Sequence, residues 1–129
     1  MKKITEEWLN SAGYDLRLIF KIADDKELTH LVAFHAQQCI EKSLKALLDE
    51  KGLDVQKIHN LVTLYNKIKI YLKEPVDIQK LKILDQLYLD SRYPGSLGLL
   101  PDGRPSIEEA ADFIQFAEKL YNAVRSSLD

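Results

Sequence analysis

The sequence predicts an all-α fold, an antiparallel up-and-down bundle of four to five helices. Apolar residues recur at steps of three and four in five segments, and no stretch alternates apolar and polar residues for long enough to form a strand. The connectors between these segments are short, and short connectors favour antiparallel packing of consecutive helices. We therefore expect residues 1–129 to fold as one helical domain.

The expected helices are delimited by capping residues and helix breakers. Asn60 is placed to cap the third helix and Pro75 to stop it, while Ser106 and Glu109 form a capping box at the start of the last one. Gly52 lies just past the second helix, where glycine adopts a left-handed backbone at least cost. The helices are expected over about residues 5–23, 29–50, 61–73, 77–88 and 106–124.

Composition sets limits on the class of protein. At 129 residues with 46% hydrophobic residues, the chain is long enough to bury a core without disulfides or metal ions. Its net charge of −2 lacks the basic excess that nonspecific binding to duplex DNA requires, so we expect no such binding. The single cysteine, Cys39, suits a reducing compartment, and no apolar run approaches the ~20 residues that span a bilayer. We therefore expect a cytoplasmic protein that does not insert into membranes.

The second helix has two faces of different character. Its apolar arc, expected to form the core, contains Val32, Ala33, Ala36, Cys39, Ile40, Leu44, Leu47 and Leu48. The opposite face contains His35, Gln38, Glu41, Lys42 and Lys45, together with two large apolar residues, Leu31 and Phe34. One interpretation is a solvated face with helix-spaced ion pairs such as Glu41–Lys45. The alternative is an interface with another chain or another helix, including Leu31, Phe34 and Gln38.

Residues 34–48, FHAQQCIEKSLKALL, resemble the signature helix of the HEPN domain family. Further matches follow in the family's order along the chain and comprise Trp8, Ala12 and Asp15-Leu16, then His59-Asn60-Leu61 with Leu64, then Ser91-Arg92-Tyr93-Pro94. The resemblance implies a bundle of four or five helices that is often a homodimer. It also implies one of two settings: many members are encoded beside a minimal nucleotidyltransferase, and others are ribonucleases, commonly the toxin of a toxin–antitoxin pair.

The ribonuclease members use an arginine followed four to six residues later by a histidine, and no arginine of this chain has a histidine at that spacing. We therefore expect no catalytic residues. The expected function is that of a noncatalytic subunit that binds a nucleotide or RNA end and partners a minimal nucleotidyltransferase, in a toxin–antitoxin pair. Two alternatives remain open: a ribonuclease toxin with an atypical site built from His35 and Arg92, and a plain dimeric interaction module.

An anion pocket is the remaining candidate site. It requires the stretch 91–105, whose three glycines and three prolines exclude a helix, to fold back on the second helix. The Arg92 guanidinium has a fork of donors suited to phosphate, and Tyr93 can stack on a base. The residues expected to bind the phosphate or the base are Arg92, Tyr93, Lys42, Lys45 and His35.

Structural roles are the alternatives for these residues. Arg92 can pair with Asp85 or Asp90, His35 can be a hydrogen-bonded interface histidine, and His59 is expected to be structural. The sequence contains no HExxH motif, no cysteine–histidine set and no glycine-rich phosphate loop. We therefore expect neither a metal ion nor a cofactor.

Overall fold

The computed structural model describes residues 1–54, 57–91 and 104–129. Within these ranges the chain forms five α-helices and one 3₁₀ turn, with no strand, so the predicted all-α fold is confirmed. The elements in chain order are α1 (Lys3–Lys21), α2 (Thr29–Glu50), α3 (Leu61–Ile68), η1 (Lys69–Tyr71), α4 (Ile78–Ser91) and α5 (Ile107–Leu128).

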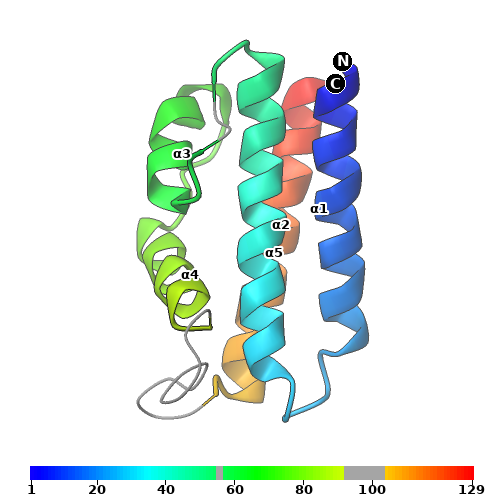
Figure 1. Cartoon of the computed structure of the whole chain (residues 1–129), viewed down its shortest axis with the longest axis vertical. Coiled ribbons are helices and arrows are strands. Elements are labelled where there is room, and N and C mark those ends of the chain that lie inside the picture. The colour runs from blue at the N-terminus through cyan, green and yellow to red at the C-terminus, as the bar shows by residue number, and fades with distance from the viewer. Residues whose placement is uncertain (55–56, 92–103) are drawn as a thin grey trace.

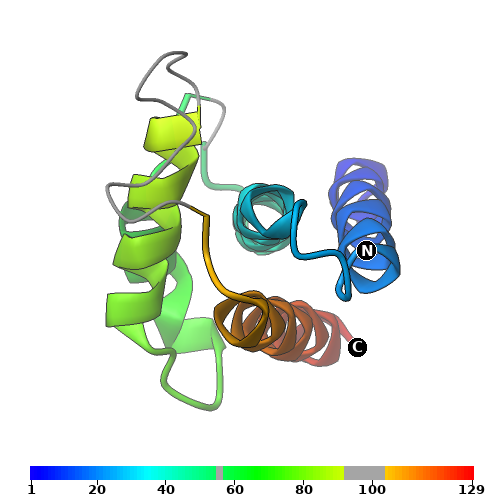
Figure 2. The same ribbon diagram turned by 90° about the horizontal axis from the view of Figure 1, so that it is seen from below.

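α2 is the central helix and packs against α1, α3, α4 and α5. α1 lies antiparallel on one side of α2, α3 and α4 lie on the other side, and α5 lies behind (Figure 1). Seen along the bundle, α1, α2 and α5 form a triangle, and α4 lies beside α2 (Figure 2). α5 runs antiparallel to α1, so both termini lie at the same end of the bundle (Figure 1).

The apolar arc of α2 forms the centre of the core, as predicted, and every residue in it is buried. Ile40, Leu44 and Leu47 are wholly inaccessible to solvent, and the removal of each from water contributes roughly 1.5–3 kcal/mol. The two longest neighbouring helices bury matching stripes against it, comprising Leu9, Ala12, Leu16 and Ile19 of α1 and Phe113, Ala117, Leu120 and Val124 of α5. Packing against α2 therefore holds the bundle together along its length.

The predicted caps are present. Gly52 has φ of 77°, the left-handed conformation that ends α2. The Asn60 side chain accepts a hydrogen bond from the Thr63 amide at 2.9 Å and so caps α3. Ser106 and Glu109 form the capping box, in which each side chain accepts a hydrogen bond from the other residue's amide, at 3.0 and 2.9 Å. These local signals fix where the helices begin and end.

Two helices end earlier than predicted. α1 ends at Lys21, because the chain turns at Ile22, whose carbonyl accepts a hydrogen bond from the Asp25 amide at 3.1 Å. α3 ends at Ile68 and tightens into η1, after which Leu72 is extended, with φ of −103° and ψ of 135°. A tertiary contact explains this reversal: the Tyr65 hydroxyl accepts a hydrogen bond from the Val76 amide at 3.2 Å and ties the connector back to α3.

The predicted breaker stretch, residues 91–105, lies almost wholly outside the described residues. In the part of the chain that the structure describes, every helix is too short or too polar to cross a bilayer.

Candidate functional site

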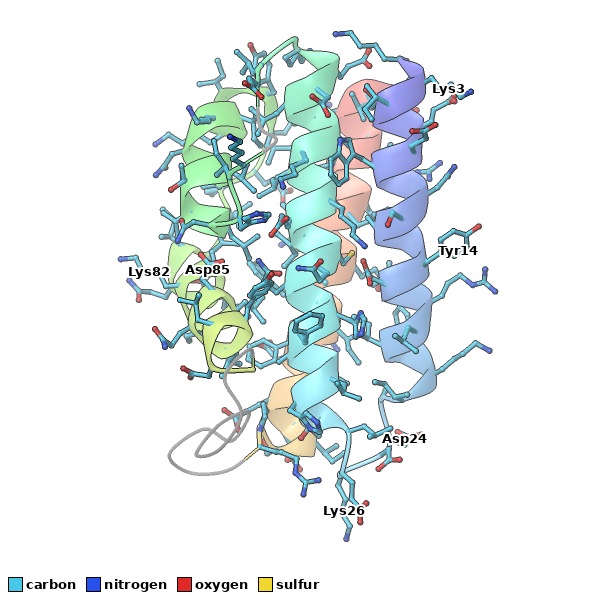
Figure 3. The ribbon with its side chains drawn as sticks, in the orientation of Figure 1. Lys3, Tyr14, Asp24, Lys26, Lys82 and Asp85 are labelled. Atoms are coloured by element: carbon cyan, nitrogen blue, oxygen red, sulfur yellow. The ribbon has the colours of Figure 1, made fainter. Side chains whose placement is uncertain are left out.

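The polar side of α2 is partly buried, and the interpretation of a solvated face is therefore wrong. The predicted ion pair is present, with 3.1 Å between Lys45 Nζ and Glu41 Oε2, but only 3% and 7% of these side chains are exposed. The reason is tertiary, because Trp8 of α1 and His59, which precedes α3, both reach over this side of α2. The polar residues form two clusters, one around Asp15 of α1 and one that includes His59, which precedes α3. Figure 3 shows the side chains of the whole bundle.

The first cluster, called here the Asp15 cluster, consists of Asp15 of α1 with His35 and Lys42 of α2. Asp15 Oδ1 lies 2.9 Å from His35 Nδ1, and Oδ2 lies 2.7 Å from Lys42 Nζ. A carboxylate only accepts hydrogen bonds, so Nδ1 carries the proton in this arrangement. Asp15 is buried, whereas 27% of the His35 side chain and 22% of the Lys42 side chain are exposed. The cluster therefore presents two cationic or donor groups to solvent above one buried acid.

The second cluster, called the Glu41 cluster, consists of Gln37, Glu41, Lys45 and His59. Besides Lys45, the Glu41 carboxylate meets His59 Nδ1 at 3.2 Å and accepts a hydrogen bond from Gln37 Nε2 at 3.3 Å. The ammonium of Lys45 lies 5.4 Å from the centre of the Trp8 ring, where the negative face of the indole attracts a cation. His59 thus has the structural position that we expected, and its carbonyl also accepts a hydrogen bond from Gln37.

Asp85 links α4 to the start of α3. Its two carboxylate oxygens accept the Leu61 amide at 3.1 and 3.0 Å, and Figure 3 shows the side chain on the side of α4 that faces α2. Burial raises the pKa of Asp85 above its usual value, and hydrogen bonds from the Leu61 and Val62 amides and the Gln37 side chain only partly offset it. A carboxylate at this helix N-terminus is favoured by the dipole of α3.

The three predicted interface residues lie on the same side of α2. Phe34 stacks on Tyr88 of α4, with 5.3 Å between ring centres and 16° between ring planes, so another helix of the same chain covers part of this residue. Leu31 remains 37% exposed. Gln38 donates a hydrogen bond to the side chain of Gln37 at 2.7 Å. Leu31 is therefore the large apolar residue of this set that most needs a further partner.

The structure brings together some of the residues of the predicted phosphate pocket. His35 and Lys42 share the carboxylate of Asp15. Lys45 belongs to the Glu41 cluster instead, and its burial leaves little of it for a ligand. Arg92 and Tyr93 lie outside the described residues. Of the described candidates, His35 and Lys42 are therefore the pair that could meet one phosphate.

Metal binding and thiol chemistry find no support among the described residues. No group of three histidine, cysteine or acidic side chains in these ranges is arranged to hold a metal ion. Cys39 is fully buried in the core, and burial, followed by the charge of Asp15, raises the pKa of its thiol to about 12. A thiol of that kind is inert as a nucleophile at neutral pH.

Asp15 and Asp85 were not among the predicted site residues, and the sequence contains only an indirect signal for them. Asp15 lies between Ala12 and Ile19 on the buried stripe of α1, and a charged residue within an apolar stripe is the pattern that marks a buried polar contact. Asp85 likewise lies beside the buried residues of α4, directly after Leu84 and one helical turn after Leu81. Neither position reveals its partners, because these lie 20 or more residues away in the chain.

Comparison with known proteins gives concordant results. The HEPN domain family model matches residues 5–127. The crystal structure of ST0689, an archaeal HEPN homologue, is similar with a TM-score of 0.74 and 28% sequence identity, over 100% of both chains. The crystal structure of TT1696 from Thermus thermophilus has a TM-score of 0.74 and 26% identity, over 98% of this chain and 99% of that one. No curated protein matches the chain.

Proposed function

Because this chain belongs to the HEPN domain family, we propose that it is a noncatalytic HEPN subunit that binds a nucleotide or an RNA end. In the same proposal it forms a homodimer and partners a minimal nucleotidyltransferase, as one half of a toxin–antitoxin pair. The carrying observation is the charge balance of the Asp15 cluster. His35 and Lys42 both meet the single carboxylate of Asp15. When the imidazole is protonated, the cluster carries one uncompensated positive charge.

An anion can meet this charge without displacing Asp15, since both cationic side chains are about one quarter exposed. His35 uses Nδ1 toward Asp15, and its Nε2 makes no hydrogen bond among the described residues. Lys42 has three donors and uses one on Asp15. Phosphate can therefore accept a further hydrogen bond from Lys42, and one from His35 Nε2 when the imidazole is protonated. Arg92 is proposed as the third cationic group.

The noncatalytic part of the proposal is supported by the sequence, in which the arginine and histidine spacing of the ribonuclease members does not occur. The partner-binding part is supported by Leu31, which lies one helical turn from His35 on α2 and is exposed. A partner that covers Leu31 therefore also borders the Asp15 cluster, so ligand and partner are expected to affect each other's binding.

Titration calorimetry with AMP, ATP and a short 5′-phosphorylated RNA tests the ligand. Lys42→Ala should weaken binding, and Arg92→Ala should weaken it more, by about 1.5–3 kcal/mol for a charge-assisted hydrogen bond. Asp15→Asn should strengthen binding, because it removes the carboxylate that competes for both donors. Lys82→Ala is the matched control, since Lys82 is exposed on α4 and points away from α2 (Figure 3).

The absence of saturable heat with all three ligands contradicts the ligand proposal. It is also contradicted if Asp15→Asn weakens binding as Lys42→Ala does, because both changes would then act through stability alone. Circular dichroism melting of each variant separates these cases. Light scattering on the same samples measures the oligomeric state. A dimer that binds none of the three ligands supports the alternative of a plain dimeric interaction module.

The partnership has its own test. A neighbouring reading frame with the GSxxxG and DxD motifs of a minimal nucleotidyltransferase is the expected genetic setting. Co-expression of the two proteins should give a complex that co-elutes and that Lys82→Ala leaves intact. If the neighbouring frame encodes no such enzyme, or if the two proteins elute separately, the partnership is wrong while the ligand proposal remains.

A second candidate function, an atypical ribonuclease, is favoured by one observation. Asp15 holds His35 through Nδ1 and thereby orients the imidazole, the arrangement that supports a histidine base in many hydrolases. Incubation of labelled RNA with the purified protein tests it. Cleavage that disappears in His35→Gln and persists in Lys82→Ala supports the ribonuclease, and intact RNA with the parent protein excludes it.

A further inference from the structure

A second polar surface lies on the opposite side of α1 from the Asp15 cluster, where α1 and α5 run side by side (Figures 1 and 2). It contains Tyr14 and Arg17 of α1 with Tyr121 and Arg125 of α5, and is called here the tyrosine–arginine face. Tyr14 is 66% exposed and points away from α2 (Figure 3). The proposed phosphate site uses none of these four residues, and Tyr121 also packs, half-buried, against the core.

Each arginine of this face lies over a tyrosine ring. The centre of the Arg17 guanidinium is 6.0 Å from the centre of the Tyr14 ring. The corresponding distance from Arg125 to Tyr121 is 5.7 Å, and Arg125 also donates a hydrogen bond of 3.0 Å to the Tyr121 hydroxyl. This hydrogen bond, followed by the electrostatic interaction with Tyr121 and then the charge of Asp129, raises the pKa of Arg125. The face therefore keeps two planar cations beside two aromatic rings.

Arg17 and Arg125, like most of the lysines in the part of the chain that the structure describes, are not held in ion pairs. Within the described ranges, neither guanidinium lies within ion-pair distance of a carboxylate. Several lysines do pair with acids, namely Lys42, Lys45, Lys80 and Lys119. An arginine that has no carboxylate partner in the protein is available to an anion from outside.

The face is also hollowed. A depression of about 300 Å³ lies between α1 and α5 and is lined by Asn10, Gly13, Tyr14, Leu16, Arg17 and Tyr121. Gly13 lies in the interior of α1, where glycine destabilises a helix relative to alanine. A Cβ at this position would lie 3.1 Å from the Tyr121 hydroxyl. A residue with low helix propensity, Gly13, thus occupies the position in α1 against which Tyr121 packs. Residues that disfavour the local structure occur most often at functional positions.

We propose that the tyrosine–arginine face binds single-stranded nucleic acid. The tyrosine rings would stack on unpaired bases and the arginines would bind the phosphates between them, the combination that proteins use for single strands without strong sequence preference. Duplex bases are already stacked on one another, so the same face should discriminate against double strands. This site is independent of the Asp15 cluster, because Asp15 faces α2 and Tyr14 faces away from it.

A second copy of this chain is a less suitable occupant. Symmetric docking of two copies through the face would bring four guanidinium groups together. Like charges placed opposite one another disfavour association. Single-stranded nucleic acid instead supplies a negative charge and an aromatic surface at every nucleotide, which matches both components of the face.

Fluorescence anisotropy with a labelled short oligouridylate, and with a duplex of the same length, tests the proposal on the full chain. Tyr14→Ala should weaken binding to the single strand by at least about fivefold, the loss typical of one stacked base. Arg17→Ala and Arg125→Ala should each weaken it by about tenfold and lower the slope of log K against log salt by about 0.7. The matched control is Lys119→Ala, which removes one exposed charge from another side of α5 and should change neither quantity.

Four results would overturn the proposal. These are no saturable binding of the single strand, equal binding of the duplex, equal effects of Arg125→Ala and Lys119→Ala, or a dimer in light scattering that Arg17→Glu dissociates. Lys42→Ala separates the two sites. Loss of binding in Lys42→Ala alone leaves the proposed function standing and removes this inference. Loss in the arginine variants alone supports this inference and leaves the proposed phosphate site to the calorimetry described above. Apart from Lys42, which is partly buried, these substitutions are at exposed positions. Circular dichroism verifies that each variant is folded.

Discussion

Lys45 Nζ lies 3.1 Å from Glu41 Oε2, one turn earlier in α2, and both side chains are buried. The removal of two charges from water costs several kcal/mol per ion unless further contacts offset it. Here Glu41 also meets His59 and Gln37, and Lys45 also lies against the ring of Trp8. The polar side of α2 therefore ties α1, α2 and the segment before α3 together through one ion pair.

The first prediction is that the removal of one charged partner destabilises the protein, because the other charge stays buried and unpaired. Lys45→Met leaves the Glu41 carboxylate buried without its cation, and should lower the free energy of unfolding by about 3–5 kcal/mol. The double variant Glu41→Gln/Lys45→Met should lose less than the sum of the two single losses, because no charge is then left unpaired. Urea denaturation of the four proteins measures this coupling. Strictly additive losses would show that the pair is not energetically coupled.

The second prediction concerns self-association. Leu31 is exposed on α2, and Leu31→Glu should dissociate a homodimer into monomers with a change of less than about 0.5 kcal/mol in monomer stability, as is usual at surface sites. Light scattering at micromolar concentration measures the mass. Leu89→Glu is the control, since Leu89 is exposed to a similar extent on α4. A parent protein that is already a monomer, or a dimer that persists in Leu31→Glu, contradicts an interface through this residue.

The third prediction is a pH dependence due to Asp85. Its pKa is raised by burial, so the folded protein holds this proton more tightly than the unfolded chain. The resulting stabilisation is full below the pKa of an unfolded aspartate, about 3.9, and is lost as the pH rises through the folded pKa. Asp85→Asn removes this titration and keeps one oxygen to accept the Leu61 amide.

Thermal melts of the parent and of Asp85→Asn across the range from about pH 4 to 7 provide the measurement. The stability of the parent relative to the variant should decline as the pH rises. A relative stability that increases with pH would mean that the amides at the start of α3 favour the charged carboxylate more than burial disfavours it.

The fourth prediction isolates a backbone effect. Gly52 has φ of 77°, and a Cβ added there would meet no atom within 4 Å. Gly52→Ala should therefore cost about 1–2 kcal/mol, the penalty of the left-handed conformation for an L-residue with a side chain. Gly52→Asn should cost less, because asparagine tolerates this conformation better. Chemical denaturation measures both, and equal stability of Gly52→Ala and the parent would refute the assignment.

The sequence by itself determined most of the local structure. The range of α2 and the caps Asn60 and Ser106 were predictable, because capping and helical periodicity depend on residues within one or two turns. The apolar arc of α2 and the left-handed Gly52 were predictable for the same reason. The family was also predictable, since its motifs are spread in order along the chain.

Only the tertiary structure decided how the polar side of α2 is used. Glu41 and Lys45 have the spacing of a surface ion pair, yet Trp8 and His59 cover them. The early end of α3 likewise depends on the contact of Tyr65 with Val76. Periodicity shows which residues share a face of a helix, but burial depends on what packs against that face. That information lies in contacts between residues far apart in the chain, such as Asp15 with His35, and no local pattern encodes them.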